Sequence, residues 1–388
     1  MNLSAFSRSP LIRGVVLITG VVLLESMAAV PAAADETAIG WTRVPSPNRG
    51  NQSSYLSALG VISPDDVWAV GAWYRPISTP GTLTEHWNGS AWSVVPSPNV
   101  TEGYNELYGI AAVSSTDVWA VGYHNISAYG SEKTMALHWN GSKWSVVPTR
   151  NIGPNANFLL GASAVASNDV WAVGLGASTS SEVGRPLIQH WDGARWSLVS
   201  NPNLGGGFGI LNEVVALAAD DVWAVGSHDG STLIEHWDGS SWTVVPSPEG
   251  PLAESELYAV SAAGPDDIWA VGQSYNFLAG ETLVEHWDGA AWTLVPSLDG
   301  VPPFTALYGV LALGPNNVWA VGSTYDPVSV DYNTFTEHWN GTTWTRVPSP
   351  NPGPIYDQLL GVAGSPGGDV WAVGQAHVNT LIIRTSDE

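Results

Sequence analysis

Short apolar segments alternate with turn residues along almost the whole chain, and they recur in a fixed order. In the second repeat these segments are LYGIAAV from Leu107, VWAVG from Val118, TMALHW from Thr134 and WSVVP from Trp144. Short runs rich in Val, Ile, Leu and Trp, bounded by Gly, Asn, Asp and Pro, are typical of β-strands. The Asn-Gly or Asp-Gly between the third and fourth segments predicts a two-residue hairpin turn.

The VWAVG segment, which reads IWAVG in one copy, marks the repeat. It occurs seven times, and successive tryptophans are 46 to 52 residues apart. Four antiparallel strands every ~40–50 residues are the signature of a β-propeller blade. No stretch keeps a helical period long enough to compete with this interpretation. The tryptophans of the seven copies are Trp68, Trp119, Trp171, Trp223, Trp269, Trp319 and Trp371.

The two ends of the sequence complete one blade together. Seven first, seven second and seven third strands can be counted, the last being TLII from Thr380, but only six fourth strands follow them. The missing strand stands at the start, because GWTRVPSPN from Gly40 matches TTWTRVPSPN from Thr342. We therefore predict an all-β, seven-bladed β-propeller with four antiparallel strands per blade, closed by pairing of the N-terminal strand with the C-terminal strands. Such closure leaves no open sheet edge to invite aggregation.

Aromatic residues follow the same repeat. Of the 21 tryptophans, 20 occupy repeat positions, and an indole buries ~150–250 Å². We expect these rings to fill the widening gap between the outer strands of neighbouring blades. A histidine precedes the third-strand tryptophan in six blades, and we expect these side chains to be hydrogen-bonded between blades. They are His86, His138, His190, His236, His286 and His338.

The first residues carry the marks of a targeting segment. Two arginines precede an apolar run of eleven residues, Gly14 to Leu24, and a small-residue AAA ends at Ala34. This order is typical of a secretory signal peptide, and the run is too short to cross a bilayer of ~30 Å as a helix. We predict a signal peptide over residues 1–34 and a single propeller domain over 35–388, in a secreted, extracellular protein without membrane insertion.

Charge and cysteine content narrow the function further. The formal charge is −23, and removing residues 1–34 takes away two arginines and one glutamate, which leaves −24. A surface with this much negative charge repels the phosphate backbone of nucleic acids. We therefore expect no nucleic-acid partner. The absence of cysteine excludes disulfides and thiolate metal sites. The irregular histidines His124, His228 and His377 belong to different blades, which argues against a zinc site. We expect a monomer without metal or cofactor.

The phrase DDVWAVG…TLIEHWDGSSW resembles the repeats of secreted bacterial β-propeller proteins. That broad group includes kelch and galactose-oxidase-type propellers and the BNR/Asp-box and photosystem-assembly-factor-like propellers. The resemblance implies the architecture and covers nearly the whole chain after the leader. The sequence departs from the enzymes of the group, because it has no kelch Gly-Gly doublet and no cysteine for a copper site. Sialidase-like sites gather several arginines, whereas no motif surrounds those in the loops here, Arg49, Arg75, Arg150 and Arg185.

Residues that break the repeat are the candidates for function. In a propeller the second-to-third and fourth-to-first connections emerge on one face, and here these loops vary in length and content. Binding residues concentrate on loops held by a rigid scaffold, and aromatic side chains beside polar groups suit glycans and proteins alike. The candidate ligand-binding residues are Trp73, Tyr74, Tyr104, Tyr123, Asn125, Tyr129, Tyr275, Tyr325, Asp326, Tyr332, Tyr356 and Asp357.

One further candidate lies within the scaffold. Ten residues before each VWAVG tryptophan stands Ala or Gly in six repeats, but the fourth repeat has Glu213. First strands line the central channel, so this carboxyl is expected in or beside the channel, where it could bind a cation or act as an acid or base. A solvated structural role is the alternative, since two-carboxylate chemistry needs a partner.

Three functions remain open at this point. The first is a secreted, non-catalytic protein that binds glycan or protein through its variable face. The second is a polysaccharide hydrolase or lyase with Glu213 and loop carboxylates at the channel mouth. The third is a purely structural surface protein. No Ser/His/Asp motif and no phosphate loop supports catalysis, so the sequence assigns no catalytic residue.

Overall fold

The computed structural model describes residues 40–49, 52–74, 79–125, 132–177, 184–298 and 304–385. These residues form 28 β-strands, β1 to β28, and within them there is no helix. They belong to one compact unit that begins at Gly40. The predicted signal peptide lies outside the described residues.

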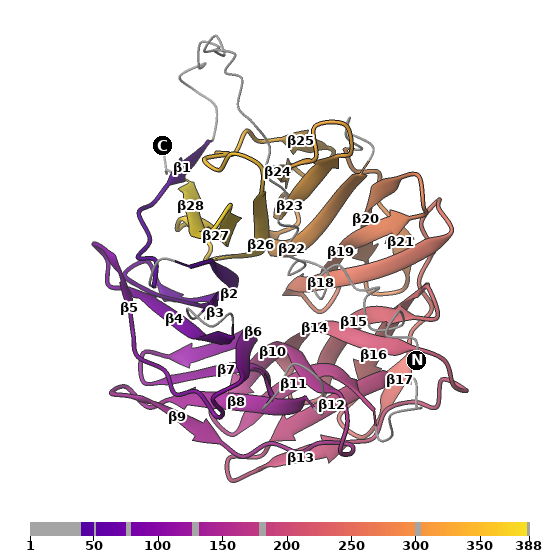
Figure 1. The fold of residues 1–388 in the computed structure, drawn as a ribbon. Coiled ribbons are helices and arrows are strands. Elements are labelled where there is room, and N and C mark those ends of the chain that lie inside the picture. Colours follow the sequence, from indigo (N-terminus) through magenta and orange to yellow (C-terminus); the bar gives the residue numbers. More distant parts are fainter. Residues whose placement is uncertain are drawn as a thin grey trace. The chain divides into compact units, whose positions relative to one another are not determined.

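The strands form seven four-stranded antiparallel blades arranged around a ring, as predicted (Figure 1). One parallel pair, Gly280 with Phe304, joins two neighbouring blades into an eight-stranded sheet. The first strand of each blade is innermost. The first strands are β2 (Ser54–Ser63), β6 (Tyr104–Ser114), β10 (Asn157–Ala166), β14 (Gly209–Ala218), β18 (Glu254–Gly264), β22 (Phe304–Gly314) and β26 (Asp357–Gly364). The second strands, which carry the VWAVG phrase, are β3 (Asp66–Tyr74), β7 (Asp117–Asn125), β11 (Asp169–Gly176), β15 (Asp221–His228), β19 (Asp267–Tyr275), β23 (Asn317–Asp326) and β27 (Val370–Ala376).

The outer half of each blade consists of a longer and a very short strand. The third strands are β4 (Pro80–Trp87), β8 (Lys133–Trp139), β12 (Arg185–Trp191), β16 (Ser231–Trp237), β20 (Gly280–Trp287), β24 (Asp331–Trp339) and β28 (Asn379–Thr385). The fourth strands are β5 (Trp92–Val94), β9 (Trp144–Val147), β13 (Trp196–Val199), β17 (Trp242–Val244), β21 (Trp292–Leu294), β25 (Trp344–Arg346) and β1 (Trp41–Arg43). Blades 1 to 6 start at β2, β6, β10, β14, β18 and β22; blade 7 consists of β26, β27, β28 and β1.

Blade 7 closes the ring with strands from both ends of the described chain. Trp41 pairs with Thr385 and Arg43 with Ile383, and the backbone N–H of Val44 donates to the carbonyl oxygen of Ile382 at 2.9 Å. Indigo β1 therefore lies beside yellow β28 in Figure 1. The predicted closure is confirmed.

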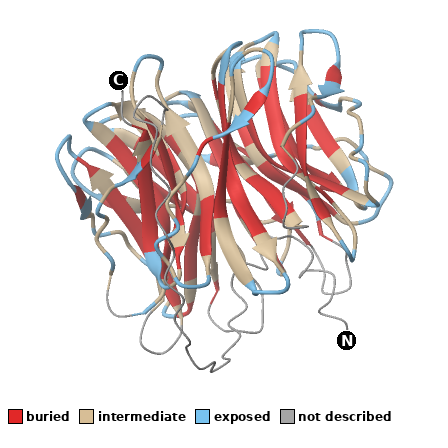
Figure 2. Cartoon of the chain, turned by 90° about the horizontal axis from the view of Figure 1, so that it is seen from above, coloured by how far each residue is buried: buried red, intermediate tan, exposed pale blue. Residues whose placement is uncertain are grey.

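The core consists of apolar layers between neighbouring blades rather than one central cluster. Each layer combines the VWAVG tryptophan of one blade with strands of the next blade. Trp371 of blade 7, for example, packs with Leu56, Trp87 and Trp92 of blade 1. The ring centroids of Trp371 and Trp92 are 5.5 Å apart in an edge-to-face arrangement. The tryptophans therefore fill the gap between outer strands, as expected, and Figure 2 shows the buried residues along the strands and the exposed ones at the turns.

The repeated histidine has its partner within its own blade, which corrects the expectation of hydrogen bonds between blades. Nε2 of His86 lies 2.8 Å from Oδ1 of Asp66, and the imidazole packs on Trp68 with ring centroids 4.4 Å apart. The antiparallel pairing of β3 with β4 places Trp68 opposite His86, next to the aspartate that opens β3. The same arrangement recurs in blades 2 to 6, with Asn317 in place of aspartate in blade 6.

Buried polar side chains link neighbouring blades near the third strand. Glu85 is fully buried, and its Oε2 accepts a hydrogen bond from Oγ of Ser46, in the loop after β1, at 3.0 Å. Glu337 accepts in the same way from Ser297 at 2.7 Å. At the same register position Glu235 is fully buried, and neither of its carboxyl oxygens has a hydrogen-bond partner. Because a buried carboxylate without a partner is unfavourable, the fold favours the protonated form of Glu235.

Candidate functional site

Two faces of the ring differ in how the strands are joined. The hairpins between first and second and between third and fourth strands lie on one face, which we call the hairpin face. The connections from second to third strands, and from one blade to the next, lie on the other, which we call the variable face. An antiparallel order of four strands requires this separation. All candidate loop residues that the structure describes belong to the variable face, whereas Tyr129 lies outside the described residues.

In blades 1 and 2 the variable-face end of the inner strands holds a carboxyl surrounded by tyrosines. Glu106 on β6 is buried, and its Oε2 accepts hydrogen bonds from the hydroxyls of Tyr55 and Tyr108, each at 2.7 Å. Tyr123 on β7 also donates to Glu106. Burial raises the pKa of Glu106, while the three phenol hydrogen bonds lower it. The carboxyl is thus engaged by protein groups from two blades.

Tyr74 and Tyr104 lie at the edge of this cluster. Burial raises the pKa of Tyr74 far above its usual value, and the nearby Glu106, Tyr104 and Tyr356 raise it further. The Tyr74 hydroxyl is buried and has no hydrogen-bond partner. Three of the predicted residues, Tyr74, Tyr104 and Tyr123, therefore come together around a carboxyl that was not among the candidates.

A second aromatic group crosses blades 5, 6 and 7 on the variable face. Phe304 on β22 pairs with Gly280 of blade 5 and lies 6.0 Å from the ring of Tyr325. The rings of Tyr325 and Tyr332 are 4.6 Å apart, and those of Tyr332 and Tyr356 are 4.9 Å apart. We call Phe304, Tyr325, Tyr332 and Tyr356 the aromatic band. It brings together three of the predicted residues from β23, β24 and the loop before β26.

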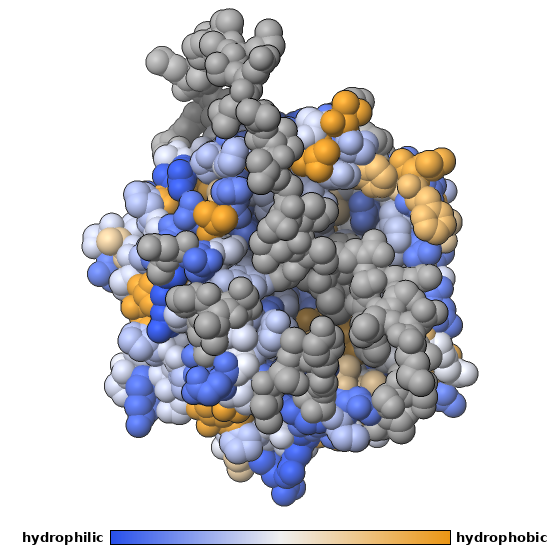
Figure 3. Space-filling model, in the orientation of Figure 1, coloured by the Kyte–Doolittle hydropathy of each residue, from blue (hydrophilic) through white to orange (hydrophobic). Residues whose placement is uncertain are grey.

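Strongly exposed apolar side chains lie on the loops along the aromatic band. Figure 3 shows hydrophobic surface over blades 5 and 6 on the side that faces the viewer. Five large apolar side chains on these loops are 53% to 102% exposed, whereas the other exposed large apolar residues of the described chain do not exceed 46%. We call them the apolar patch. Its members are Phe277, Leu278, Val328, Val330 and Ile355.

The loop that carries two members of the patch is strained. Val330 has a φ of 62°, a left-handed conformation that is a genuine outlier for a β-branched residue. Its N–H donates to the carbonyl oxygen of Asp326 at 2.8 Å, and the N–H of Val328 donates to Oδ1 of Asp326 at 2.8 Å. Asp326, a predicted binding residue, therefore holds this turn. Its hydrogen bonds keep both valines on the surface.

Glu213 lies on the inner strand β14, and its side chain turns towards blade 3. Oε1 accepts the N–H of Val214 at 3.0 Å, and a Cβ added to Gly161 of β10 would lie 2.5 Å from the same oxygen. Burial raises the pKa of Glu213 to about 8, and backbone hydrogen bonds from Val214 and Ala162 lower it. The small residue in blade 3 thus makes room for this carboxyl, which is anchored to backbone amides.

The remaining predicted residues lie on the variable face without forming one site. The guanidinium of Arg49 lies 4.5 Å above the ring of Trp73. Nδ2 of Asn125 donates to Glu132 at 3.2 Å. Asp357 is buried, accepts the N–H of Gly353 at 2.9 Å, and has its pKa raised by burial. Tyr275 ends β19, where it pairs with the first residue of β20.

Two inner-strand carboxyls were missed by the sequence reasoning. Glu106 and Glu256 stand one residue before the leucine that all seven first strands share. Oε1 of Glu256 accepts a hydrogen bond from Nδ2 of Asn212 in blade 4 at 3.1 Å. Every first strand has a register shift directly after this leucine, as between Leu107 and Gly109. The repeated phrase ELY in these two blades was the available signal, because the other five blades have no acidic residue there.

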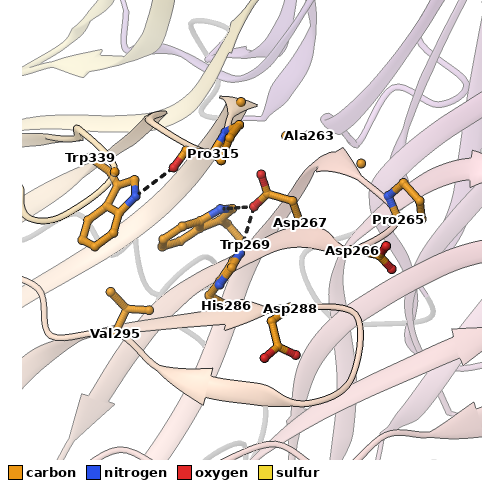
Figure 4. A pocket seen from close by; sticks show the side chains of 13 residues that line it. Ala263, Pro265, Asp266, Asp267, Trp269, His286, Asp288, Val295, Pro315 and Trp339 are labelled. Carbon is orange, nitrogen blue, oxygen red and sulfur yellow. Dashed lines mark hydrogen bonds and ion pairs between the residues drawn. The ribbon is translucent and has the colours of Figure 1, made fainter.

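The hairpin face carries a groove between blades 5 and 6. It has a volume of about 540 Å³ and is lined among others by Asp267, His286, Asp288 and Trp339. In Figure 4, Oδ1 of Asp267 is hydrogen-bonded to both the Trp269 indole and His286, and the Trp339 indole donates to the carbonyl oxygen of Pro315. The histidine and its aspartate are the pair that recurs around the ring, so this groove is built from the repeat.

Two further properties concern metals and membranes. Among the described residues no group of three or more His, Asp or Glu side chains is arranged to hold a metal ion. Within the same parts of the chain, the structure has no helix able to cross a membrane.

The comparisons with known proteins show the fold. No protein-family model and no curated protein matches the chain. Among solved structures, YCF48 bound to D1 peptide is similar with a TM-score of 0.56 and 13% identity, covering 92% of this chain and 99% of that one. YCF48 from Cyanidioschyzon merolae has a TM-score of 0.55 and 14% identity, covering 89% of this chain and 98% of that one. The GH74 xyloglucanase from Xanthomonas campestris has a TM-score of 0.54 and 13% identity, covering 88% of this chain but only 55% of that one. At these identities the likeness concerns the propeller architecture.

Proposed function

We propose that this protein is a secreted, non-catalytic binding protein that holds a polypeptide ligand on its variable face. The observation that supports this most strongly is the apolar patch: among the described residues, every large apolar side chain that is more than half exposed lies on this face. Apolar surface gathered in one place marks interaction sites in soluble proteins. The aromatic band, whose Tyr325 and Tyr356 stand close to Val328 and Ile355 in the chain, supplies the rigid side chains that dominate protein interfaces.

The carboxyls argue for binding rather than hydrolysis. A glycoside hydrolase needs two carboxyl groups facing the sugar, roughly 5–10 Å apart. Here Glu106 accepts from tyrosines, Glu256 from Asn212, and Glu213 from backbone amides. Each of these three inner-strand carboxyls is engaged by the protein, and the similarity to a GH74 xyloglucanase extends to the scaffold alone.

Polypeptide fits the patch better than glycan. A sugar stacks on a free ring face, but the tyrosines of the aromatic band pack against one another at 4.6 and 4.9 Å. The most exposed groups are instead the side chains of Phe277, Leu278 and Val328. Apolar groups of this kind are buried by other apolar side chains. A similar propeller, YCF48, has been seen with a bound peptide.

Export is part of the proposal and can be checked separately. The order of two arginines, an apolar run and AAA before Asp35 supports cleavage at that point. Mass spectrometry of protein recovered from the culture medium should give a chain that starts near Asp35. Recovery of the uncleaved chain inside the cell would contradict this part.

The binding proposal is tested by probing the purified protein against a random peptide array and a glycan array side by side. We expect binding to a family of peptides with micromolar affinity or better and no binding to glycans. Binding to glycans alone, or a blank on both arrays, would overturn the proposal. Release of reducing sugar from any polysaccharide that binds would favour the hydrolase.

A further inference from the structure

The acidic charge of this protein is concentrated in one part of the ring. Between Trp196 and Thr345 the sequence has 18 aspartates and glutamates and not a single lysine or arginine. All 12 basic residues of the chain lie outside that stretch. It includes blades 4 and 5 and all of blade 6 except its last strand residue. The electrostatic field over these blades therefore attracts cations, because Arg346 at the end of blade 6 is the one basic residue within the three blades.

The apolar patch lies within this acidic part. Four of its five members, Phe277, Leu278, Val328 and Val330, belong to loops of blades 5 and 6. The carboxyls closest to them in the chain are Asp326, Asp331 and Glu281, which are partly exposed. A ligand that covers the patch must therefore bring apolar groups to the valines and positive charge to the carboxyls around them.

The shape of the surface favours a chain that lies across two or three blades. Contacts run without a break from Gly280 of blade 5 through Phe304, Tyr325 and Tyr332 to Tyr356 before blade 7. The turn at Phe277 is held by Asn276, whose Oδ1 accepts the N–H groups of Leu278 and Ala279 at 2.8 and 3.0 Å. The apolar side chains are thus presented by ordered turns, which lowers the entropy lost on binding.

We propose that the apolar patch binds a cationic amphipathic polypeptide segment, in which lysine or arginine alternates with apolar residues. This inference rests on the proposed function and names its ligand. The apolar side chains of the segment cover Phe277, Leu278, Val328 and Val330. Its positive groups face Asp326, Asp331 and Glu281, and the negative field of blades 4 to 6 speeds its approach.

Three synthetic peptides of equal length separate the contributions. The first alternates lysine with leucine, the second has glutamate in place of each lysine, and the third has serine in place of each leucine. The affinity of each peptide is measured by fluorescence anisotropy. We expect the lysine–leucine peptide to bind at least about tenfold more tightly than either counterpart, because both burial and charge contribute. Its affinity should fall as salt is raised, since exposed charges are screened within ~10 Å at 0.1 M.

Variants locate the binding site. Val328→Ser combined with Phe277→Ser should weaken binding of the lysine–leucine peptide by about tenfold or more, because both side chains are exposed anchors. The matched control is Val244→Ser combined with Leu294→Ser, since these two residues are each 46% exposed on short outer strands. The control should bind as the unchanged protein does.

Each possible result decides between the two proposals. Equal binding of the glutamate peptide, or unchanged binding by the Val328/Phe277 variant, would overturn this inference. If the peptide array instead yields neutral or acidic ligands whose binding is lost in that variant, the proposed function stands and the cationic ligand is wrong. Binding of the lysine–serine peptide as tight as that of the lysine–leucine peptide would show attraction by charge alone, which also contradicts the inference.

Discussion

Nη1 of Arg384 lies 3.0 Å from Oδ2 of Asp369, and the guanidinium lies 5.1 Å from the centre of the Trp371 ring. In the other six blades a histidine takes the corresponding place beside the aspartate or asparagine and the VWAVG tryptophan. Arg384 also lies 5.7 Å from the ring of Trp87 in blade 1. The residue that departs from the repeat therefore connects the closing blade with its neighbour.

Replacing Arg384 by alanine should destabilise the closed ring. The variant loses a partly exposed ion pair and two cation–π contacts, so we expect a loss of about 1–2 kcal/mol in the free energy of unfolding. Denaturant unfolding followed by tryptophan fluorescence measures it. The matched control is Arg384→His, which restores the residue of the other blades and should recover most of the loss. Equal stability of all three proteins would contradict the role given to Arg384.

Stability should fall as the pH rises from 5 to 8, because of the buried glutamates. Burial raises the pKa of Glu85, Glu235 and Glu285 to about 8, against ~4.3 in an unfolded chain. The folded state therefore holds more protons than the unfolded state across this window, so the stabilisation present at acid pH is lost as the pH approaches 8. Thermal unfolding should give a lower Tm at pH 8 than at pH 5.

Glu235→Gln tests the origin of that slope. Blade 3 already has Gln189 at the same register position, where its Oε1 accepts the N–H of Arg150 at 2.9 Å. The neutral amide should flatten the pH profile and raise stability at pH 8 by about 1–3 kcal/mol relative to the parent protein. The exposed Asp266→Asn should leave the profile unchanged. A Glu235→Gln profile that is parallel to the parent would show that this carboxyl is already ionised in the fold.

Relieving the strain at Val330 should stabilise the protein while weakening ligand binding. A left-handed β-branched residue is unfavourable by ~1–2 kcal/mol, whereas glycine adopts this conformation freely but loses more backbone entropy on folding. We expect Val330→Gly to gain about 0.5–1 kcal/mol in unfolding free energy and to bind the lysine–leucine peptide less tightly. Asp229→Gly is the control, because Asp229 has a φ of 49° but accepts the N–H of Phe208 at 2.8 Å. That variant should lose stability. A gain in stability in both Val330→Gly and Asp229→Gly would contradict the strain argument.

The architecture could be predicted because every blade repeats its apolar segments and the ends of the sequence fit together. The pairing of Trp41 with Thr385 follows directly from the match between the first and later WTRVP phrases. The histidine partner could not be predicted, since spacing alone does not reveal that the register of β3 and β4 brings Asp66 to His86.

The candidate site was predicted less completely, for a physical reason. Loop aromatics such as Tyr325 and Tyr356 could be found by their departure from the repeat, but their contacts depend on how neighbouring blades meet. The surroundings of Glu213 depend on the small Gly161 in the preceding blade, which is far away in sequence. The exposure of Val328 depends on a turn held by Asp326 that no apolar pattern indicates.

The choice of the variable face as the ligand-binding surface can be tested most directly with environment-sensitive fluorophores. The chain has no cysteine, so Val328→Cys on the variable face and Ala290→Cys on the hairpin face each offer a single labelling site. The tightest peptide from the array is titrated into both labelled proteins. We predict a saturable change in emission for the label at position 328 and none at position 290. A change at position 290 alone would place the ligand on the opposite face and contradict the account.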